Sequence, residues 1–153
     1  MDRIEFKWTD GNNEDFQQFY IETEKYYSQI VGGVEKRAGF VPYNLSDTIS
    51  DVLIAYIHGK PVGCAGLKKY SDSDVEIKRV WVEAESRGQK IASRMMDFIE
   101  EKARQMNYKR AILQTRPIML DAVGLYERRG YSLIDNYPPY DCLEGAICMA
   151  LVL

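Results

Sequence analysis

Three strand patterns that follow one another directly constrain the fold of this chain more than any other feature. Residues 52–57 and 61–70 carry strand-forming residues on either side of the tight turn His58-Gly59-Lys60, which predicts an antiparallel hairpin. A second turn leads to another strand pattern at 75–83, after which the chain enters a helix. The sequence therefore predicts an α+β fold that contains an antiparallel meander.

The helix after the meander has the clearest periodicity in the chain. Its apolar residues recur at helical spacing for about five turns, and they are Ile91, Met95, Phe98, Ile99, Ala103 and Met106. An earlier helix is predicted between a cap at Asn12 or Asn13 and a stop at Gly32-Gly33. Its expected apolar stripe is Phe16, Phe19, Tyr20, Thr23, Tyr27, Ile30 and Val31.

Shorter elements complete the secondary-structure prediction. Strands are expected at 4–8, 110–115, 131–134 and 146–151. A short helix is expected at 121–129, with Asp121 as its cap and Gly130 as its terminator. Residues 34–50 show no regular pattern and stay unassigned. Because no repeat or linker interrupts the sequence, one domain is expected over residues 1–153.

The strand pattern at 75–83 changes parity in the middle. Val75 and Ile77 occupy odd positions, whereas Val80 and Val82 occupy even positions. One extra residue in a β-bulge would keep all four on the core face. The alternative is a strand buried on both faces, which need not alternate.

Length and charge exclude several classes of protein. The chain has 153 residues, a hydrophobic fraction of 46% and a charged fraction of 28%, which are typical of a globular domain. A net charge of −3 offers no concentrated basic face for nucleic acid. No apolar run approaches the roughly 18 residues that span a bilayer. We therefore expect neither a nucleic-acid nor a membrane partner.

The cysteines and the histidine indicate a reducing compartment and no metal site. Cys64, Cys142 and Cys148 are an odd number without CxxC spacing, so reduced thiols in the cytoplasm are expected rather than disulfides. His58 is the one histidine and lies beside a turn, where a solvated role is expected. The role of the cysteines stays open.

The turn before the long helix has the character of an anion site. Arg87-Gly88-Gln89-Lys90-Ile91-Ala92 opens the helix, and the first amides of a helix lack an internal partner and face a favourable dipole. Arg87 and Lys90 add positive charge. A phosphate site is one interpretation, and an ordinary helix start with solvated charges is the other.

Three motifs in this order resemble the GNAT superfamily of acetyl-CoA-dependent N-acetyltransferases. They are Glu76-Ile77-Lys78-Arg79-Val80-Trp81-Val82, then Arg87 to Ala92, then Leu125-Tyr126-Glu127-Arg128-Arg129-Gly130-Tyr131. The resemblance implies a three-layer fold with a mixed, mostly antiparallel central sheet and helices on both faces. It also implies acetyl-CoA as the acetyl donor, an amine acceptor that is a small molecule or a peptide, and direct attack on the thioester.

The resemblance assigns donor-site residues by position. It implies that the amides of Arg87, Gly88, Gln89, Lys90, Ile91 and Ala92 hold the pyrophosphate of coenzyme A, and that the main chain of Val80, Trp81 and Val82 pairs with the pantetheine arm. Lys90 replaces the central glycine of the family motif, and Met119 stands where asparagine or glutamine is frequent. We expect Lys90 to be tolerated by taking helical dihedral angles, with its side chain turned from the coenzyme or contacting a phosphate.

Glu76 and Tyr126 are the candidate catalytic residues. An alkyl amine must lose a proton before it attacks a thioester, and the departing thiolate gains one. By position, the resemblance implies Glu76 as the base, directly or through water, and Tyr126 as the acid. The alternatives are a solvated strand carboxylate for Glu76 and a core aromatic for Tyr126.

The acceptor site is expected in the irregular segments. Tyr43, Asn44 and Tyr140, with Tyr137 nearby, lie in loops, where binding residues concentrate. Aromatic residues in a closing loop also seal the core, so both roles stay open for them. The alternative function is a non-catalytic acyl-CoA-binding regulatory domain of the same fold, and a homodimer is compatible with either function.

Overall fold

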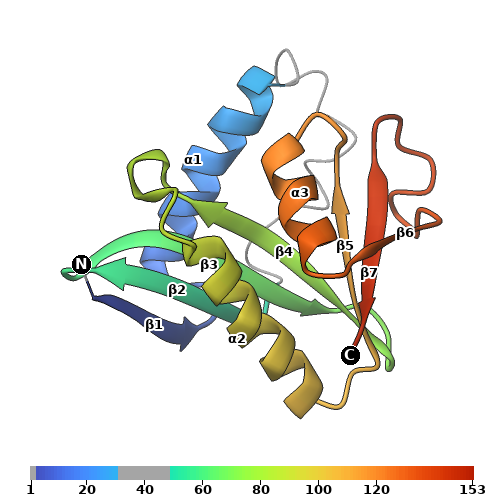
Figure 1. Cartoon of the computed structure of the whole chain (residues 1–153), viewed down its shortest axis with the longest axis horizontal. Coiled ribbons are helices and arrows are strands. Elements are labelled where there is room, and N and C mark those ends of the chain that lie inside the picture. The colour runs from blue at the N-terminus through green and yellow to red at the C-terminus, as the bar shows by residue number, and fades with distance from the viewer. Residues whose placement is uncertain (1–2, 31–48) are drawn as a thin grey trace.

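The computed structural model describes residues 3–30 and 49–153, which form a seven-stranded sheet with three α-helices (Figure 1). The strand order is β1-β2-β3-β4-β5-β7-β6, and each neighbouring pair is antiparallel except β4 and β5. The strands are β1 (Ile4–Thr9), β2 (Asp51–Ile57), β3 (Lys60–Lys69), β4 (Asp74–Val82), β5 (Arg110–Thr115), β6 (Ser132–Ile134) and β7 (Ile147–Val152). The helices are α1 (Glu14–Ile30), α2 (Ile91–Gln105) and α3 (Leu120–Arg128), with a 3₁₀ turn, η4, at Ala84–Ser86.

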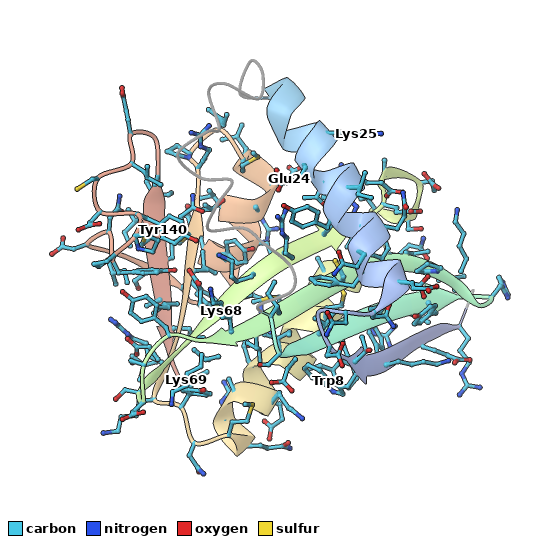
Figure 2. All side chains as sticks on the ribbon, turned by 180° about the vertical axis from the view of Figure 1, so that it is seen from behind. Trp8, Glu24, Lys25, Lys68, Lys69 and Tyr140 are labelled. Carbon is cyan, nitrogen blue, oxygen red and sulfur yellow. The ribbon has the colours of Figure 1, made fainter. Side chains whose placement is uncertain are left out.

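The helices cover both faces of this sheet. In Figure 1, α2 and α3 lie in front of the sheet and α1 lies behind it, and Figure 2 shows α1 from its own side. The front layer packs Met95 and Ile99 of α2 against Leu53 and Ile77. The back layer packs Phe16 of α1 against the other face of the same strands. The predicted mixed sheet with helices on both faces is confirmed.

The hairpin at the centre of the prediction forms as expected. β2 and β3 pair antiparallel, and His58 and Gly59 make the turn with φ angles of 51° and 76°. A two-residue turn with positive φ angles matches the twist of the strands that it joins. The meander then continues into β4, which pairs with β3.

The bulge that was one of the two interpretations of the parity change in β4 is present. Gly66 faces Lys78 and Cys64 faces Trp81, so Arg79 and Val80 together stand opposite Ala65. Arg79 has a φ of 60°, which places the extra residue in the left-handed region. The four β4 valine and isoleucine residues therefore share the α2 face. The opposite face of β4 is buried as well, because Glu76, Lys78 and Arg79 are at most 9% exposed.

The helix boundaries differ from the predictions in detail. The Asn13 side chain caps α1 by accepting a hydrogen bond from the Phe16 amide at 3.1 Å. Gly130, with a φ of 94°, ends α3 as predicted. The prediction of Asp121 as the α3 cap is wrong, because Met119 occupies the cap position and Asp121 lies in the first turn. The predicted stop of the first helix and the unassigned stretch at 34–48 lie outside the described residues.

Two residues expected on the buried stripe of α2 are partly exposed. Phe98 is 43% exposed and Met106 is 39% exposed, whereas Met96 is fully buried. Phe98 packs against Phe6 of the edge strand β1, with ring centroids 4.9 Å apart. β1 is the edge strand of the sheet, so the outer side of this stripe remains partly open to solvent.

β4 and β5 separate soon after they meet. They pair in parallel only where residues 74–76 face residues 110–112. Beyond Glu76, β4 continues to Val82 with β3 as its partner on the other side. Among the described residues, no strand pairs with this edge of β4 beyond Glu76, so its main-chain groups there are available to a ligand. Within the described ranges, none of the helices has the length and apolar character needed to cross a membrane.

Candidate active site

A cavity of about 1180 Å³ lies where β4 and β5 separate. Residues 76–82 of β4 form one wall, and α3 with the segment before it forms another. The turn that opens α2 closes one end. Among the described lining residues, seven are lysine or arginine and two are acidic, so the cavity suits an anionic ligand.

The turn before α2 supplies the amides that the sequence predicted. The first helical bond of α2 runs from the Arg94 amide to the Lys90 carbonyl at 3.0 Å. The amides of Ile91, Ala92 and Ser93 precede that bond and have no acceptor within the helix. Gly88 has a φ of 86°, a conformation that favours glycine, and lines the cavity. The site residues of this turn are therefore brought to one end of the cavity, except Gln89.

Lys90 does not adopt the helical dihedral angles that the sequence analysis expected. Its φ of 60° and ψ of 26° place it in the left-handed region at the cap position of α2. That expectation is wrong because the chain turns through a left-handed residue here, which explains why glycine is common at this point of the family motif. Lys90 is exposed and lines the cavity, so its ammonium group is available to an anion.

Arg87 and Gln89 use their side chains to hold the turn itself. Arg87 Nε donates to the Val82 carbonyl at 3.0 Å, and its guanidinium lies 5.1 Å from the centre of the Trp81 ring. Gln89 Nε2 donates to the Ser86 carbonyl at 3.3 Å. These contacts fix the turn against the end of β4, so the two side chains position the amides.

The end of β4 presents its main chain to the cavity. Val80, Trp81 and Val82 all line the cavity. The Val80 and Val82 side chains contact the α2 core, whereas the Trp81 ring packs against Tyr26 of α1 with centroids 5.0 Å apart. The strand is thus clamped between both layers, which leaves its main-chain edge as the part that faces β5.

Glu76 lies at the inner end of the cavity and is only 6% exposed. The alternative of a solvated carboxylate is therefore wrong. Tyr137 Oη donates to Glu76 Oε2 at 2.7 Å, and Lys78 Nζ lies 3.6 Å from Glu76 Oε1. Burial, reinforced by the charge of Glu76, raises the pKa of Tyr137, so this phenol stays a proton donor.

Tyr126 is 7% exposed and lines the same cavity as Glu76. Its ring packs against Tyr131 with centroids 5.7 Å apart, and its carbonyl accepts the Tyr131 amide at 3.0 Å. Tyr126 is therefore a core aromatic and a cavity residue at once, and its place at the end of α3 is fixed from both sides.

Tyr140 is the described member of the predicted acceptor residues. It is 1% exposed, borders the cavity, and accepts a hydrogen bond from Lys78 Nζ at 2.8 Å. Figure 2 shows it on the α1 side of the sheet. It packs with Tyr137, Ile112 and Cys148, so it seals a core as well. Tyr43 and Asn44 lie outside the described residues.

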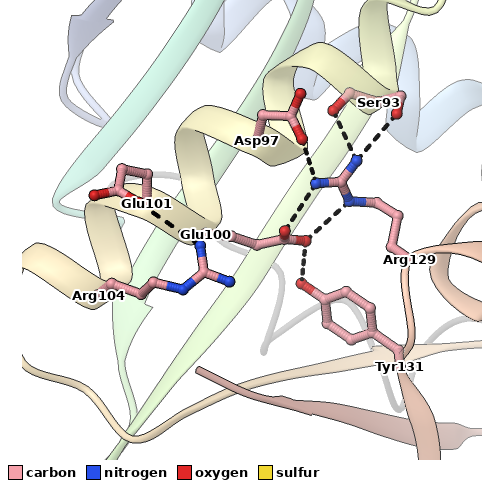
Figure 3. Close-up of polar contacts among 7 residues, drawn as sticks. All are labelled: Ser93, Asp97, Glu100, Glu101, Arg104, Arg129 and Tyr131. Carbon is pink, nitrogen blue, oxygen red and sulfur yellow. Dashed lines mark hydrogen bonds and ion pairs between the residues drawn. The ribbon is translucent and has the colours of Figure 1, made fainter.

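Sequence reasoning missed the side chains that hold α3 onto α2. Arg129 forms two hydrogen bonds with the carboxylate of Glu100 and also donates to the Ser93 carbonyl at 3.1 Å (Figure 3). Tyr131 Oη donates to the same carboxylate at 3.0 Å. A glutamate on the buried face of a predicted helix was the signal that a basic partner would be needed. Lys78 was missed as well, because its hydrogen-bond partner Tyr140 lies 62 residues away.

Metal chemistry finds no support in the described part of the chain. No group of three or more histidine, cysteine or acidic side chains there could hold an ion. Cys64 and Cys148 are buried and Cys142 is exposed, and all three are free thiols. None of the three is among the described residues that line the cavity.

The chain belongs to the GNAT acetyltransferase family, whose model matches residues 5–131. It is 32% identical over 80 residues to the uncharacterized N-acetyltransferase YjgM of Escherichia coli (strain K12), a match that covers 50% of this chain and 48% of that protein. The chain thus spans about half the length of the curated relatives that it matches.

Solved structures share the fold over the whole chain. A protein from Klebsiella pneumoniae named as an acyl-CoA N-acyltransferase has a TM-score of 0.82 and 21% identity, with 98% of this chain and 97% of that chain covered. A GNAT family acetyltransferase from Elizabethkingia anophelis, solved with acetyl-CoA bound, has a TM-score of 0.71 and 17% identity, with both chains fully covered at 100%. These likenesses establish the GNAT fold.

Proposed function

We propose that this protein is an N-acetyltransferase that moves the acetyl group of acetyl-CoA to a primary amine by direct attack. The observation that carries the proposal is the cavity between β4 and β5, which Glu76, Tyr126 and the turn before α2 all line. A site that joins an anion-binding turn to a candidate base and a candidate acid suits acyl transfer from a phosphorylated donor. Family membership and the acetyl-CoA complex of the Elizabethkingia protein support the same donor.

The donor end of the cavity fits coenzyme A. The amides at the start of α2 and the helix dipole favour the pyrophosphate, and Lys90 and Arg128 in the lining add positive charge. The open edge of β4 from residue 77 to residue 82 offers main-chain partners to the amide groups of the pantetheine arm. Donor binding would thus continue the sheet at the point where its own strands separate.

Glu76 is the proposed general base. An alkyl amine with a pKa of about 10.4 is protonated near neutral pH, and its deprotonation at pH ~7.4 costs about 4 kcal/mol. Glu76 accepts this proton, directly or through a water molecule. Each carboxylate oxygen has two lone pairs, so the hydrogen bond from Tyr137 leaves acceptor capacity on Oε2.

Tyr126 is the proposed general acid. The thiol of coenzyme A resembles a cysteine thiol with a pKa of roughly 8.5, so its thiolate is a better leaving group when a donor stands beside it. The phenol of Tyr126 can supply this proton and recover one through solvent. No described cysteine lines the cavity, which supports transfer without an acetylated cysteine. We place the activity in the cytoplasm, where the three free thiols stay reduced.

The test is thiol release from acetyl-CoA across a panel of spermidine, L-lysine, kanamycin and a short peptide with a free N-terminus. We expect coenzyme A to appear only when an accepted amine is present, together with the acetylated amine. Stabilisation by coenzyme A without turnover for any amine would instead support the acyl-CoA-binding domain. The absence of any thermal shift with coenzyme A would contradict both functions.

A further inference from the structure

Four polar side chains meet beneath the loop between β6 and β7, at the inner end of the cavity. Glu76 and Lys78 come from β4, and Tyr137 and Tyr140 come from the loop. Each is at most 9% exposed. Tyr137 binds one carboxylate oxygen of Glu76, Lys78 lies beside the other, and Tyr140 accepts a hydrogen bond from Lys78 at 2.8 Å.

We infer that Lys78 is a positioning residue that keeps the buried Glu76 carboxylate ionised and holds it toward the cavity. The inference rests on the proposed role of Glu76 as the base and assigns to Lys78 a function that the family motif does not. Lys78 acts through Glu76 and transfers no proton itself. Its ion pair is what keeps a carboxylate that is only 6% exposed usable as a base.

The charge balance around Glu76 supports this role. A buried carboxylate without a counter-charge takes up a proton and stops acting as a base near neutral pH. Within residues 3–30 and 49–153, the ion pair of Glu76 is formed with Lys78. Tyr137 and Tyr140 are neutral donors or acceptors, because burial raises the pKa of each of these phenols. The positive charge at the carboxylate therefore comes from Lys78.

The other charged groups around Glu76 do not replace this charge, because Arg79, which also acts on Lys78 and Tyr140, is paired with Glu24 at 2.7 Å. Tyr70 and Cys148 face Glu76 from the turn before β4 and from β7 and are neutral near pH 7, since burial raises the pKa of both. Lys68 lies opposite Glu76 in the β3–β4 ladder, but its side chain is only half-buried and solvent screens it. Burial lowers the pKa of Lys78, while the charge of Glu76 acts against this shift, so the two charges maintain each other.

Contacts with Tyr140 hold the ammonium group of Lys78 in place. Tyr140 holds the ammonium group through its hydroxyl, which accepts the 2.8 Å hydrogen bond from Lys78 Nζ. Tyr140 borders the cavity, and its hydrogen bond with Lys78 gives it a structural role there. The amine of the acceptor would then approach a carboxylate that is already ionised and oriented.

The test follows the Glu76 carboxyl directly. Protein labelled with carbon-13 at the glutamate side-chain carboxyls is titrated by NMR, and the Glu76 signal is assigned by its loss in Glu76→Gln. In the unsubstituted protein the carboxyl is expected to be ionised at pH ~7. In Lys78→Met and Lys78→Gln we expect it to titrate at a pH higher by about one unit or more. Lys78→Arg, which retains the charge, should bring the titration back toward its original position.

The matched control is Lys69→Met, which removes the same charge from a side chain that is 65% exposed. It should leave the titration of Glu76 unchanged. Equal titration of Glu76 in the unsubstituted protein, in Lys78→Met and in Lys78→Gln would overturn the inference. If neither neutral variant folds, a Glu76 carboxyl that is protonated at pH ~7 in the unsubstituted protein would overturn it as well.

Kinetics separate this inference from the proposed function. With an amine that the panel identifies, the acidic limb of the kcat/KM profile should vanish in Glu76→Gln and move to higher pH in Lys78→Met. If the acidic limb vanishes in Glu76→Gln but stays in place in Lys78→Met, the role of Lys78 is overturned and the role of Glu76 as the base is not. Full turnover of Glu76→Gln overturns the proposed base, and with it the catalytic purpose of the pair.

Discussion

Arg129 and Glu100 form a bidentate pair that joins the end of α3 to the middle of α2, with N to O distances of 2.9 and 2.8 Å (Figure 3). Glu100 is 5% exposed, so the pair is largely removed from water. The same guanidinium bonds Ser93, whose amide belongs to the first turn of α2. The proposed acid on α3 and the proposed phosphate site on α2 are therefore held in one rigid frame.

Arg129→Ala should lower the free energy of unfolding by about 3 kcal/mol, because it leaves the Glu100 carboxylate buried without its counter-charge. Urea denaturation at unchanged m value measures this loss. Arg104→Ala is the matched control, since its pair with Glu101 is exposed and loose at 3.7 Å, and it should cost less than about 0.5 kcal/mol. Equal losses in the two variants would contradict the importance of the buried pair.

Lys90 allows charge and backbone conformation to be separated. Lys90→Gly should raise the free energy of unfolding by up to about 1 kcal/mol, because the left-handed conformation burdens every residue with a Cβ. Lys90→Ala keeps that burden and should show no such gain. Both variants lose the ammonium group, so both should weaken coenzyme A binding modestly, and more at low salt.

Calorimetric titration with coenzyme A at two salt concentrations measures the electrostatic part of this prediction. Binding that is unchanged in both variants would show that the lysine is only tolerated at the turn. Equal stability of the glycine and alanine variants would contradict the left-handed conformation of Lys90.

Tyr126→Phe should lower kcat by about 100-fold or more while coenzyme A affinity stays nearly the same, since the change removes a proton donor and little else. Tyr108→Phe is a suitable control, because Tyr108 is a partly buried tyrosine that does not line the cavity. Both variants are tested by steady-state rates with an accepted amine, and by calorimetry for the binding of coenzyme A. Unchanged turnover in the first variant would remove Tyr126 from the mechanism.

The phenol of Tyr56 should make the fold sensitive to alkaline pH. Burial, together with the hydrogen bond to Asp15 at 2.8 Å, raises the pKa of Tyr56 to about 12. A group with a raised pKa in the folded state contributes stability that is complete below its unfolded pKa and is lost as the pH rises through its folded pKa. Stability should therefore decline between pH ~10 and pH ~12.

Unfolding at a series of alkaline pH values measures this decline, and Tyr56→Phe should make it less steep. Tyr131, whose pKa is raised by burial and by Glu100, contributes in the same direction in both proteins. An equally steep decline in Tyr56→Phe would show that Tyr56 has no part in it.

Local patterns predicted most of the fold because the local signals agree with the tertiary structure. The parity change between Ile77 and Val80 left a bulge and burial on both faces as alternatives, and the structure has both, because a shift by one residue restores a shared face while the opposite face is covered as well. Asp121 misled because acidic residues are favoured in the first turn as well as at the cap. Phe98 was expected to be buried and is partly exposed, because helical periodicity does not tell where the underlying sheet ends.

The site was predicted only in part because its polar contacts join distant segments. The Glu76 carboxylate and Tyr137 are 61 residues apart in sequence, and no local pattern links them. The left-handed Lys90 escaped prediction for another reason, because a lysine gives no signal for a positive φ angle. Resemblance supplied positions for Glu76 and Tyr126, whereas their surroundings required the structure.

The bulge at Arg79 makes the number of residues in β4 a part of the site. Deletion of this residue would restore a regular ladder with β3 and leave Val80 and Val82 on the α2 face, yet it would remove the extra main-chain amide and carbonyl that the bulge adds to β4. An insertion or deletion elsewhere between Glu76 and Val82 would instead turn the residues that follow it to the opposite face of the sheet. Between residues 76 and 88, insertions and deletions should therefore be tolerated far less than substitutions, even at positions where the side chain makes no important contact.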